Sequence, residues 1–431
     1  STVSSMTVDT VALAPSLNAV FADSGVSSTD KITNAINATL SGTAEKGAAV
    51  HVYDGALSLG TVTANAATGA WSLNVTSLSA GAHSFTATQT DVAGNLSGSS
   101  AAKTMTVDTA AAAMLVTPIM GDGIINASEQ TNVTISGGTT DVEAGRPLTI
   151  SVSDGSATVT GTATVVSDGS WSATGLDFSG LNEGLLTVSV SGTDVAGNLA
   201  SATTELNKDS VASITLSMPI ATDGIINASE KTDVTISGTT EGVEEGIWLT
   251  ISVTGGTSSV TGTAMVGPGG AWTGDFGLTS LTDGPLTVSV SGTDAAGNSV
   301  SASTTVVLDA TVTMPLLTLA SDTGILGTDG ITSVGTVNVG GLEAGASWQY
   351  STDNGTTWVN GTGSSLTLSG DGTKSVLVQQ TDAAGNTSAP ATLDLTLDTS
   401  IATPTITEVY DSVGTIGPVA IGDVTDDQQP K

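Results

Sequence analysis

The sequence predicts an all-β protein built from tandem immunoglobulin-like β-sandwich domains, arranged end to end as an extended rod. Three observations lead to this fold class. Marker motifs recur at nearly regular intervals, the segments between them alternate apolar and polar residues, and none of them carries a helical stripe of useful length. Clusters of Gly, Asn, Asp and Ser interrupt these segments roughly every 8–12 residues, which is typical of turns between short antiparallel strands.

Composition limits the classes of function. The 431 residues include 41 Asp and Glu against 8 Lys and Arg, a formal net charge of −33, so binding to nucleic acid or to an anionic membrane surface is not expected. A hydrophobic content of 39% is enough to build cores, and the length predicts several domains. No stretch approaches the ~18 apolar residues of a membrane-spanning helix. Without cysteine the chain has no disulfide, no thiolate nucleophile and no Cys-ligated zinc.

Internal repeats determine the predicted domain organisation. The string Asp-x-Ala-Gly-Asn begins at Asp91, Asp194, Asp294 and Asp382, and a further Asp follows each string by about one strand. Both markers predict four repeats, at 10–108, 109–209, 210–309 and 310–398, the last of them a shorter variant. Residues 1–9 would end a preceding linker, and 399–431 would begin a fifth repeat. Because the chain opens inside repeat-like sequence without a signal peptide, we expect it to be a fragment.

The second repeat illustrates the predicted strands. We expect strand A at 112–120, B at 131–137, C at 147–153, two strands of the D/E region at 159–166 and 170–178, F at 185–193 and G at 199–207. Period-2 alternation places Val188 and Val190 on one face of strand F. The equivalents are Phe85 and Ala87 in the first repeat and Val376 and Val378 in the fourth. About seven short strands in ~100 residues indicate an immunoglobulin-like sandwich.

One tryptophan stands at a matching place in each of the first three repeats: Trp71, Trp171 and Trp272. Core packing is the favoured role, because a small sandwich core needs about one large aromatic, and ligand stacking is the alternative. The fourth repeat departs from this pattern. It carries a Trp-x-Tyr strand at Trp348 and Tyr350 and a tight turn that leads back to Trp358.

The motifs taken together resemble the bacterial Ig-like repeats of giant type I-secreted surface adhesins, the biofilm-associated-protein and RTX-adhesin group. The matching segments are "VDT" at 8–10 and 107–109, "DGIINASE" at 122–129 and 223–230, the G-x-W strands and the "TDAAGN" turns; "VTDDQQP" at 424–430 resembles the start of strand B of another repeat. This resemblance covers essentially the whole chain. It implies a long cell-surface stalk, often rigidified by Ca²⁺, that projects a distal ligand-binding region.

Catalysis finds little support. His51 and His83 do not occupy equivalent positions, and neither belongs to a recognisable Ser-His-Asp pattern. The segment "DGIINASE" matches the second half of an EF-hand loop, but Pro118 and Met120 stand at the leading ligand positions, so the EF-hand interpretation is rejected. A loop that carries Asp122, Asn126 and Glu129 can still donate oxygen atoms to a site built from several segments.

Topology predicts where calcium would bind. The F–G and B–C loops of an Ig sandwich lie at its N-terminal pole and the A–B and E–F loops at its C-terminal pole, so each junction gathers oxygen ligands. Those expected at the junction of repeats 2 and 3 are Asp122, Glu129, Glu183, Asp209, Asp294 and Asn298; at that of repeats 3 and 4, Asp223, Glu230, Asp283, Asp309, Asp382 and Asn386; and at that of repeats 1 and 2, Asp23 or Asp30 with Asp108, Asp194 and Asn198. The same pattern adds Asp9, Asp91 and Asn95 at the first pole, and Asp322 and Asp398 at the last.

A purely structural role remains the alternative for these residues. Asp and Asn are common in turns, where their side chains cap backbone groups and Asn tolerates a left-handed backbone. Mechanics favours calcium, because clustered carboxylates at a short linker repel one another and an ion would reverse the sign of that interaction. Extracellular modules bind Ca²⁺ at roughly 10⁻⁴–10⁻³ M, which fits an exported protein.

We therefore predict a non-catalytic extender of a bacterial surface adhesin, extracellular and monomeric, with Ca²⁺ at its junctions and neighbouring repeats as its partners, for adhesion or biofilm formation. The adhesion target cannot be derived from the sequence. The alternative is a carbohydrate- or peptide-binding module that uses the aromatic residues Trp348, Tyr350 and Trp358 of the fourth repeat.

Overall fold

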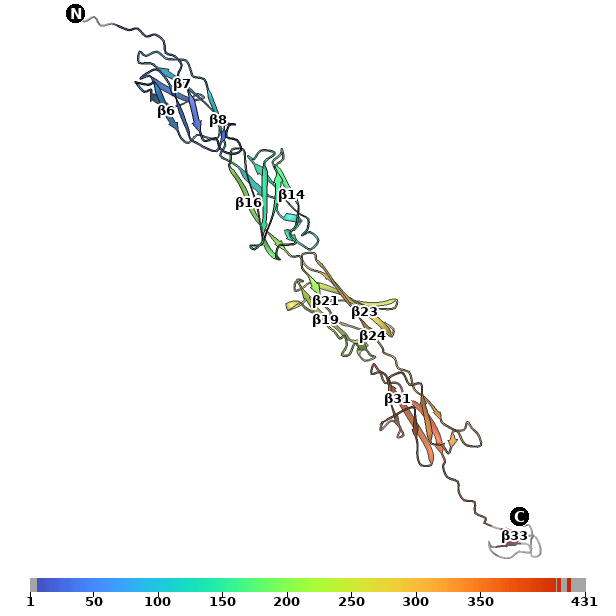
Figure 1. Cartoon of the computed structure of the whole chain (residues 1–431). Coiled ribbons are helices and arrows are strands. Elements are labelled where there is room, and N and C mark those ends of the chain that lie inside the picture. The colour runs from blue at the N-terminus through green and yellow to red at the C-terminus, as the bar shows by residue number, and fades with distance from the viewer. Residues whose placement is uncertain (1–5, 408, 412–416, 420–431) are drawn as a thin grey trace. The chain divides into compact units, whose positions relative to one another are not determined.

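A computed structural model describes residues 6–407, 409–411 and 417–419, and within them it is built from β-strands with three short 3₁₀ turns. Eight sheets form four pairs, one pair for each predicted repeat, and every pair combines a three-stranded with a five-stranded sheet (Figure 1). This is the predicted fold class of tandem Ig-like sandwiches, and the prediction is confirmed. The segment 424–430, which resembles the start of another repeat, lies outside the described residues.

The first repeat contains strands β1 to β8. The three-stranded sheet has the order β1-β3-β6 and the five-stranded sheet the order β2-β8-β7-β4-β5. The strands are β1 (Asn18–Phe21), β2 (Ile32–Thr33), β3 (Ala38–Thr43), β4 (Ala49–Asp54), β5 (Leu57–Thr63), β6 (Ala70–Val75), β7 (Gly81–Thr90) and β8 (Lys103–Val107).

The second repeat has the same plan, with sheets ordered β14-β11-β9 and β10-β16-β15-β12-β13. Its elements are β9 (Ala112–Leu115), η1 (Ile119–Gly121), β10 (Ile124–Ile125), β11 (Val133–Thr140), β12 (Pro147–Ser153), β13 (Thr158–Thr164), β14 (Ser170–Leu176), β15 (Gly184–Thr193) and β16 (Leu199–Lys208). Strands B to G therefore lie where the sequence predicts them.

The third repeat has sheets ordered β17-β19-β22 and β18-β24-β23-β20-β21. Its elements are β17 (Ser213–Ile214), β18 (Ile225–Ile226), η2 (Glu230–Thr232), β19 (Val234–Glu241), β20 (Trp248–Gly255), β21 (Ser258–Met265), η3 (Pro268–Gly270), β22 (Ala271–Phe276), β23 (Gly284–Thr293) and β24 (Ser299–Leu308).

The fourth repeat has sheets ordered β25-β27-β30 and β26-β32-β31-β28-β29. Its strands are β25 (Leu316–Leu319), β26 (Ile331–Thr332), β27 (Thr336–Gly340), β28 (Ser347–Ser351), β29 (Val359–Asn360), β30 (Ser365–Thr367), β31 (Gly372–Thr381) and β32 (Ala391–Leu397), and a separate hairpin of β33 (Val409–Asp411) and β34 (Gly417–Val419) follows. Compared with the other repeats, strand D, here β29, is reduced to two residues.

Strand A differs from its prediction. It was expected to run over 112–120, but β9 ends at Leu115 and a 3₁₀ turn, η1, follows at Ile119–Gly121. Pro118 has no N–H to give to a ladder, and Met120 adopts a left-handed backbone with φ of 56°, so an extended strand cannot continue through them. The chain then crosses to the other sheet, where β10 pairs in parallel with β16. The same crossing to strand G occurs in the other three repeats.

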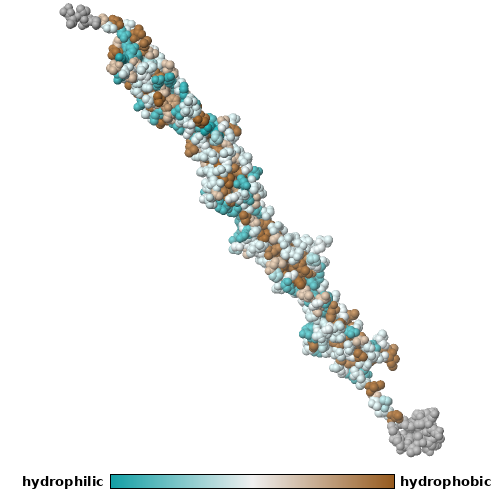
Figure 2. Space-filling model, viewed as in Figure 1, coloured by the Kyte–Doolittle hydropathy of each residue, from teal (hydrophilic) through white to brown (hydrophobic). Residues whose placement is uncertain are grey.

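The cores are formed by the inward-facing residues that the alternation predicts. Val188 and Val190 are buried, as are their equivalents in the first and fourth repeats. Trp71, Trp171 and Trp272 are 3–4% exposed, so the core-packing role is confirmed and ligand stacking is excluded for these three. Figure 2 shows a visible surface that is mostly of intermediate hydropathy, with hydrophilic and hydrophobic residues interspersed.

A glycine on strand B makes room for each of these indoles. Gly137 pairs with Trp171, and a Cβ added to Gly137 would lie 2.4 Å from Cζ2 of the Trp171 ring and 1.9 Å from the carbonyl oxygen of Met114. Gly42 and Gly238 stand opposite Trp71 and Trp272 in the same way. Strand B therefore needs glycine here, because no larger residue fits between strand A and the ring.

Backbone contacts divide the chain into two compact units. The first contains the described residues up to Ser213 together with Thr240–Ile247 and Gly292–Val300, which are B–C and F–G segments of the third repeat. The second contains Ile214–Thr239, Trp248–Ser291 and the described residues from Ser301 on. Each junction described below lies inside one of these units.

Candidate calcium sites at the repeat junctions

The linker aspartate at each junction is held by both neighbouring repeats. At the junction of repeats 2 and 3, the Asp209 N–H donates to the Ile125 carbonyl oxygen at 3.0 Å, and the Asp209 carbonyl accepts from Asn298 Nδ2 at 2.9 Å. At the junction of repeats 1 and 2, the Asp108 N–H donates to the Thr33 carbonyl at 2.9 Å, and the Asp108 carbonyl accepts from Asn198 Nδ2 at 2.9 Å. At that of repeats 3 and 4, the Asp309 N–H donates to the Ile226 carbonyl at 3.0 Å, and the Asp309 carbonyl accepts from Asn386 Nδ2 at 2.8 Å. The sequence predicted a short linker with a recurring Asp, but it did not predict that the backbone of this Asp would be hydrogen bonded to both repeats.

The F–G loop is a capped turn. Asp294 accepts hydrogen bonds from the N–H of Asn298 at 2.7 Å and from its Nδ2 at 2.7 Å, and both residues are buried. Gly297 lies between them with φ of +93°, a conformation that favours glycine. Asp91 with Asn95, Asp194 with Asn198, and Asp382 with Asn386 repeat these two bonds. The turn-cap role is therefore present in all four repeats, and it orients Asn toward the linker.

The A–B loop of one repeat contacts the F–G loop of the next. The Ala127 N–H donates to Asn298 Oδ1 at 2.8 Å, and Ala228 makes the same bond to Asn386. The first repeat uses a different loop, in which Val26 N–H donates to the Val195 carbonyl at 3.1 Å. There Gly25, with φ of +86°, packs so closely that an added Cβ would lie 2.0 Å from that same carbonyl oxygen.

The predicted A–B loop acids have local hydrogen bonds. Asp122 Oδ1 accepts from Ile124 N–H at 2.9 Å, and Glu129 Oε2 accepts from Asn126 N–H at 3.2 Å while Asn126 Oδ1 accepts from Glu129 N–H. This reciprocal arrangement resembles a capping box and stabilises the loop that docks on the next repeat. Asp223 and Glu230 repeat it in the third repeat. That these four acids bind an ion stays a prediction.

The first and fourth repeats carry a different A–B loop, with one acid that is not fully paired. Asp23 Oδ2 accepts from Lys31 N–H and Asp322 Oδ2 accepts from Gly330 N–H, but the Oδ1 atom of each is buried without a hydrogen-bond partner. Asp30 caps Ile32 N–H at 3.0 Å, like Asp122 in the second repeat. A buried, unpaired carboxylate oxygen is expensive to desolvate and is suited to a cation.

The E–F acids hold the residues that follow the linker aspartate. Glu183 forms an ion pair with Lys208 Nζ at 2.8 Å and accepts from Ser210 N–H at 2.7 Å. Burial acts to raise the pKa of Glu183, but the bonds from Lys208 and Ser210 outweigh it and lower that pKa. Asp283 accepts from Thr311 Oγ1 at 2.6 Å. Asp371, which sequence reasoning missed, accepts from Thr399 N–H at 2.8 Å in the fourth repeat.

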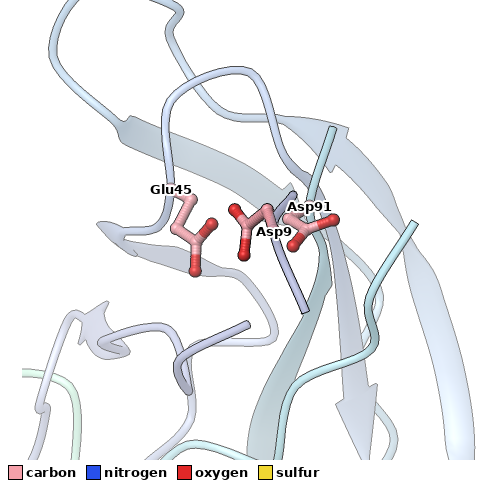
Figure 3. Close-up of side chains that lie close together, drawn as sticks. All are labelled: Asp9, Glu45 and Asp91. Carbon is pink, nitrogen blue, oxygen red and sulfur yellow. The ribbon is translucent and has the colours of Figure 1, made fainter. Parts of the chain in front are cut away.

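Sequence reasoning also missed one glutamate in each B–C loop. At the first pole, ligand atoms of Asp9, Glu45 and Asp91 all lie within 4.8 Å of one another. Figure 3 shows these three carboxylates next to one another. The equivalents of Glu45 are Glu143, Glu244 and Glu343, and each of the four stands two residues before a glycine. That recurring Glu-x-Gly was the signal that could have identified them.

Acidic neighbours dominate the electrostatics of the linker. The pKa of Asp209 is raised by burial first, and then by the negative charges of Asp294, Glu244 and Glu183. The pKa of Asp309 is raised likewise, by burial and then by Asp382, Asp283 and Glu343. Within residues 6–407 the ion pairs are Lys208–Glu183 and His83–Asp54, so neither linker carboxylate has a basic partner.

The donor set fits calcium. All the groups that converge are carboxylate, amide and carbonyl oxygens, which hard divalent cations prefer. Ca²⁺ lies ~2.3–2.6 Å from its ligands, so two oxygens on opposite sides of one ion are separated by up to ~5 Å. The ligand atoms of Asp9, Glu45 and Asp91 lie close enough to one another for this span. Asp9, Glu45 and Asp91 could thus share a single ion.

The two histidines form no catalytic arrangement. His83 is buried, and its ring nitrogens face Asp54 Oδ2 at 2.5 Å and the Ser79 carbonyl oxygen at 2.8 Å. Burial lowers the pKa of His83, but these hydrogen bonds outweigh it, and the net shift is upward. His51 contacts Thr61 Oγ1 at 3.0 Å on an adjacent strand. All three contacts are structural pairings within the first sandwich.

Only two of the three fourth-repeat aromatics proposed as a binding surface reach the solvent. Trp348 is buried in the core and donates from Nε1 to the Gly363 carbonyl at 3.0 Å, so this part of the binding-module alternative is wrong. Tyr350 and Trp358 are partly exposed. No helix among the described residues has the length and hydropathy needed to cross a membrane.

The fold and the junctions thus define tandem Ig-like sandwiches with acidic poles. Residues 9–109, the first repeat, match the family model described as bacterial Ig-like domain, which confirms the resemblance for that repeat. A search of curated proteins found no match.

Similar solved structures include the tetra-tandem repeat in the extending region of a large adhesion protein, with 26% identity over 90% of this chain and 100% of that chain (TM-score 0.34). A Ca²⁺-stabilized adhesin that helps an Antarctic bacterium reach out and bind ice has 26% identity over 90% and 99% (TM-score 0.35). A bacterial ice-binding adhesin has 25% identity over 70% and 100% (TM-score 0.34). The fold assignment for repeats 2 to 4 rests on their strand topology.

Proposed function

We propose that the chain is a non-catalytic extender of a bacterial surface adhesin, in which Ca²⁺ at the repeat junctions fixes the angle between neighbouring sandwiches. The observation that carries the proposal is the linker aspartate. Asp209 hydrogen bonds through its backbone to both neighbouring repeats, while its carboxylate faces acids from both. Rotation of one repeat against the other would therefore strain the hydrogen bonds of Asp209 and change the distances between its carboxylate and these acids.

The residues at the junction have separable roles. The Asp294–Asn298 turn presents an amide to the linker carbonyl, and the A–B loop braces that turn through the Ala127 N–H. Glu244 and Glu183 add charges from the two sides of the junction. When bound, Ca²⁺ would replace repulsion among these carboxylates by attraction to a shared centre. Without compensation, the same charges favour bending or separation of the repeats.

Localisation and biological role follow as parts of the proposal. A calcium site with the affinity typical of extracellular modules, roughly 10⁻⁴–10⁻³ M, would be filled outside the cell and not in the cytosol. Stabilisation by metal would also account for a chain without cysteine that works in an oxidising environment. Two of the similar structures come from adhesins named for binding ice, one of them Ca²⁺-stabilized. The proposed location is the bacterial surface, reached by type I secretion, with a role in adhesion or biofilm formation.

Calcium stoichiometry tests the proposal. Isothermal titration of the full chain should give at least one ion for each junction, and Asp209→Ala should remove the binding at one junction while Glu205→Gln, a change on an exposed strand position, leaves the count unchanged. Small-angle scattering should show a smaller radius of gyration after chelation. An unchanged radius of gyration together with unchanged protease sensitivity would contradict calcium rigidification.

A further inference from the structure

The fourth repeat replaces apolar core positions with polar residues. In the second repeat, Ile150, Val152 and Leu186 point into the sandwich from strands C and F and are at most 1% exposed. The third repeat has Ile251, Val253 and Leu286 at these places, equally buried. The equivalents in the fourth repeat are Tyr350, Thr352 and Lys374. They are identified by the pairing register of strands C and F and by the number of residues that separate strand F positions from the F–G Asp.

The edge of this sandwich is also open. Strand D covers strand C over seven residue pairs in the second repeat and eight in the third. In the fourth repeat β29 pairs only with Gln349 and Tyr350 of β28. The end of strand C beyond Tyr350 therefore lacks the neighbour that closes the other repeats. Thr352 is exposed, and Tyr350 and Lys374 are only half-buried.

These two changes produce a cavity of 390 Å³ at the end of the sandwich. Its walls come from β28, from β30 with the residues after it, and from the start of β31, which is labelled in Figure 1. The lining combines one aromatic ring and one aliphatic side chain with hydroxyl groups and one ammonium group, and its members include Tyr350, Thr352, Thr367, Ser369, Thr373 and Lys374. Small-molecule sites span roughly 300–1,000 Å³, so the cavity has the size of a site for one small ligand.

The Tyr350 ring packs against a second aromatic ring. Trp348 packs against Tyr350 with ring centroids 6.1 Å apart and an interplanar angle of 43°. Trp348 itself is anchored in the core by its bond to Gly363. The first repeat shows the contrast: its polar residues at two of the same positions, Asp54 and His83, hydrogen bond to one another and fill the space. In the fourth repeat the corresponding polar groups line a cavity.

We propose that this cavity is a saccharide-binding site. An aromatic ring packed against Trp348, hydroxyl groups that both donate and accept, and one cationic donor match the apolar face and the oxygen-rich rim of a sugar ring. A polyanion would be repelled by the chain's net charge of −33. The positive charge of Lys374 also interacts with the carboxylate of Asp371, which offsets part of its attraction for an anion. Lys374 in turn disfavours a cation. The site lies within one repeat, so it is independent of calcium at the junctions.

Saturation-transfer NMR on the full chain tests the site, with D-glucose, D-galactose, D-mannose and D-glucuronate as probes. We expect transfer to at least one sugar and at least tenfold weaker binding in Tyr350→Ala. The matched control is Tyr53→Ala, a half-buried tyrosine of the first repeat. Loss of signal in Lys374→Gln for glucuronate alone would identify an acidic sugar as the ligand.

A second variant separates binding from folding. Thr352→Val combined with Lys374→Leu restores the apolar pattern of the second repeat, so the fourth repeat should keep or gain thermal stability while sugar binding disappears. Absence of transfer to all four sugars in the wild-type chain, or unchanged transfer in this closing variant, would overturn the proposal. Neither result would bear on the calcium stoichiometry, so the two proposals fail separately.

Discussion

Replacement of Asp209 by Asn should change the stability of its junction in opposite directions with and without calcium. The two side chains have nearly the same shape, so the backbone bonds to Ile125 and Asn298 are expected to persist. Only the negative charge is removed. In chelator this charge opposes closure of the junction, whereas in calcium it is a ligand.

The magnitude follows from the neighbouring charges. Two unit charges 4 Å apart repel by ~1 kcal/mol in water and by ~4 kcal/mol at an effective dielectric constant of 20. Asp294 and Glu244 face Asp209 without a basic partner, while Glu183 is paired with Lys208. Given the partial exposure of the junction, we expect Asp209→Asn to stabilise it by about 1–2 kcal/mol in chelator.

In calcium the sign reverses. An ion present at 100 times its dissociation constant stabilises the bound state by ~2.7 kcal/mol, and loss of an anionic ligand should remove most of this gain. The pH dependence has a defined direction as well. Because burial and neighbouring acids raise the folded-state pKa of Asp209, the metal-free junction should become more stable as the pH falls through that pKa.

Hydrogen exchange of the full chain is the assay. The Ala127 amide donates to Asn298 across the junction, so its protection reports local opening. Glu205→Gln removes a charge from an exposed position on β16 and serves as the control. If Asp209→Asn shifts Ala127 protection in the same direction in both buffers, the electrostatic reasoning is wrong.

Three further predictions concern the scaffold. Gly25→Ala should abolish the protection of the first A–B loop against hydrogen exchange, because the new Cβ would overlap a carbonyl of the second repeat. The control Gly47→Ala has a similar positive φ but nothing within 4 Å, so it should lower the free energy of unfolding by only ~1 kcal/mol. Gly137→Ala should destabilise the second repeat by about 3 kcal/mol in denaturant unfolding followed by tryptophan fluorescence. Gly138 has open space where a Cβ would be added, so Gly138→Ala should cost less than about 1 kcal/mol. Equal effects of the two substitutions would contradict the proposed packing against the indole. The raised pKa of His83 contributes stability that is complete below the unfolded-state pKa of ~6.5 and is lost as the pH rises through the folded-state pKa. The melting temperature of the first repeat should therefore be lower at alkaline pH, and His83→Gln should remove this pH dependence.

The periodic features could be predicted because they depend on local sequence. Alternation of Val188 and Val190 with serines, and the Gly-Asn turn after Asp194, are encoded within a few residues of chain. Strand A was predicted too long, because the same apolar pattern continues past the point where Pro118 and the backbone of Met120 end the strand. The crossing to the other sheet depends on pairing with β16, which is distant in sequence.

The sequence by itself determined the repeat length, the sandwich class, the recurring linker aspartate and the acidic character of the poles, since each is a pattern repeated along the chain. Only the tertiary structure decided which acids meet. Glu45 joins Asp9 and Asp91 because the B–C loop, the linker and the F–G loop, far apart in sequence, converge at one end of the sandwich. The cavity beside Tyr350 likewise required the structure, because the polar residues Thr352 and Lys374 are visible in the sequence, but that they line one cavity beside a shortened strand D is decided by the strand pairing.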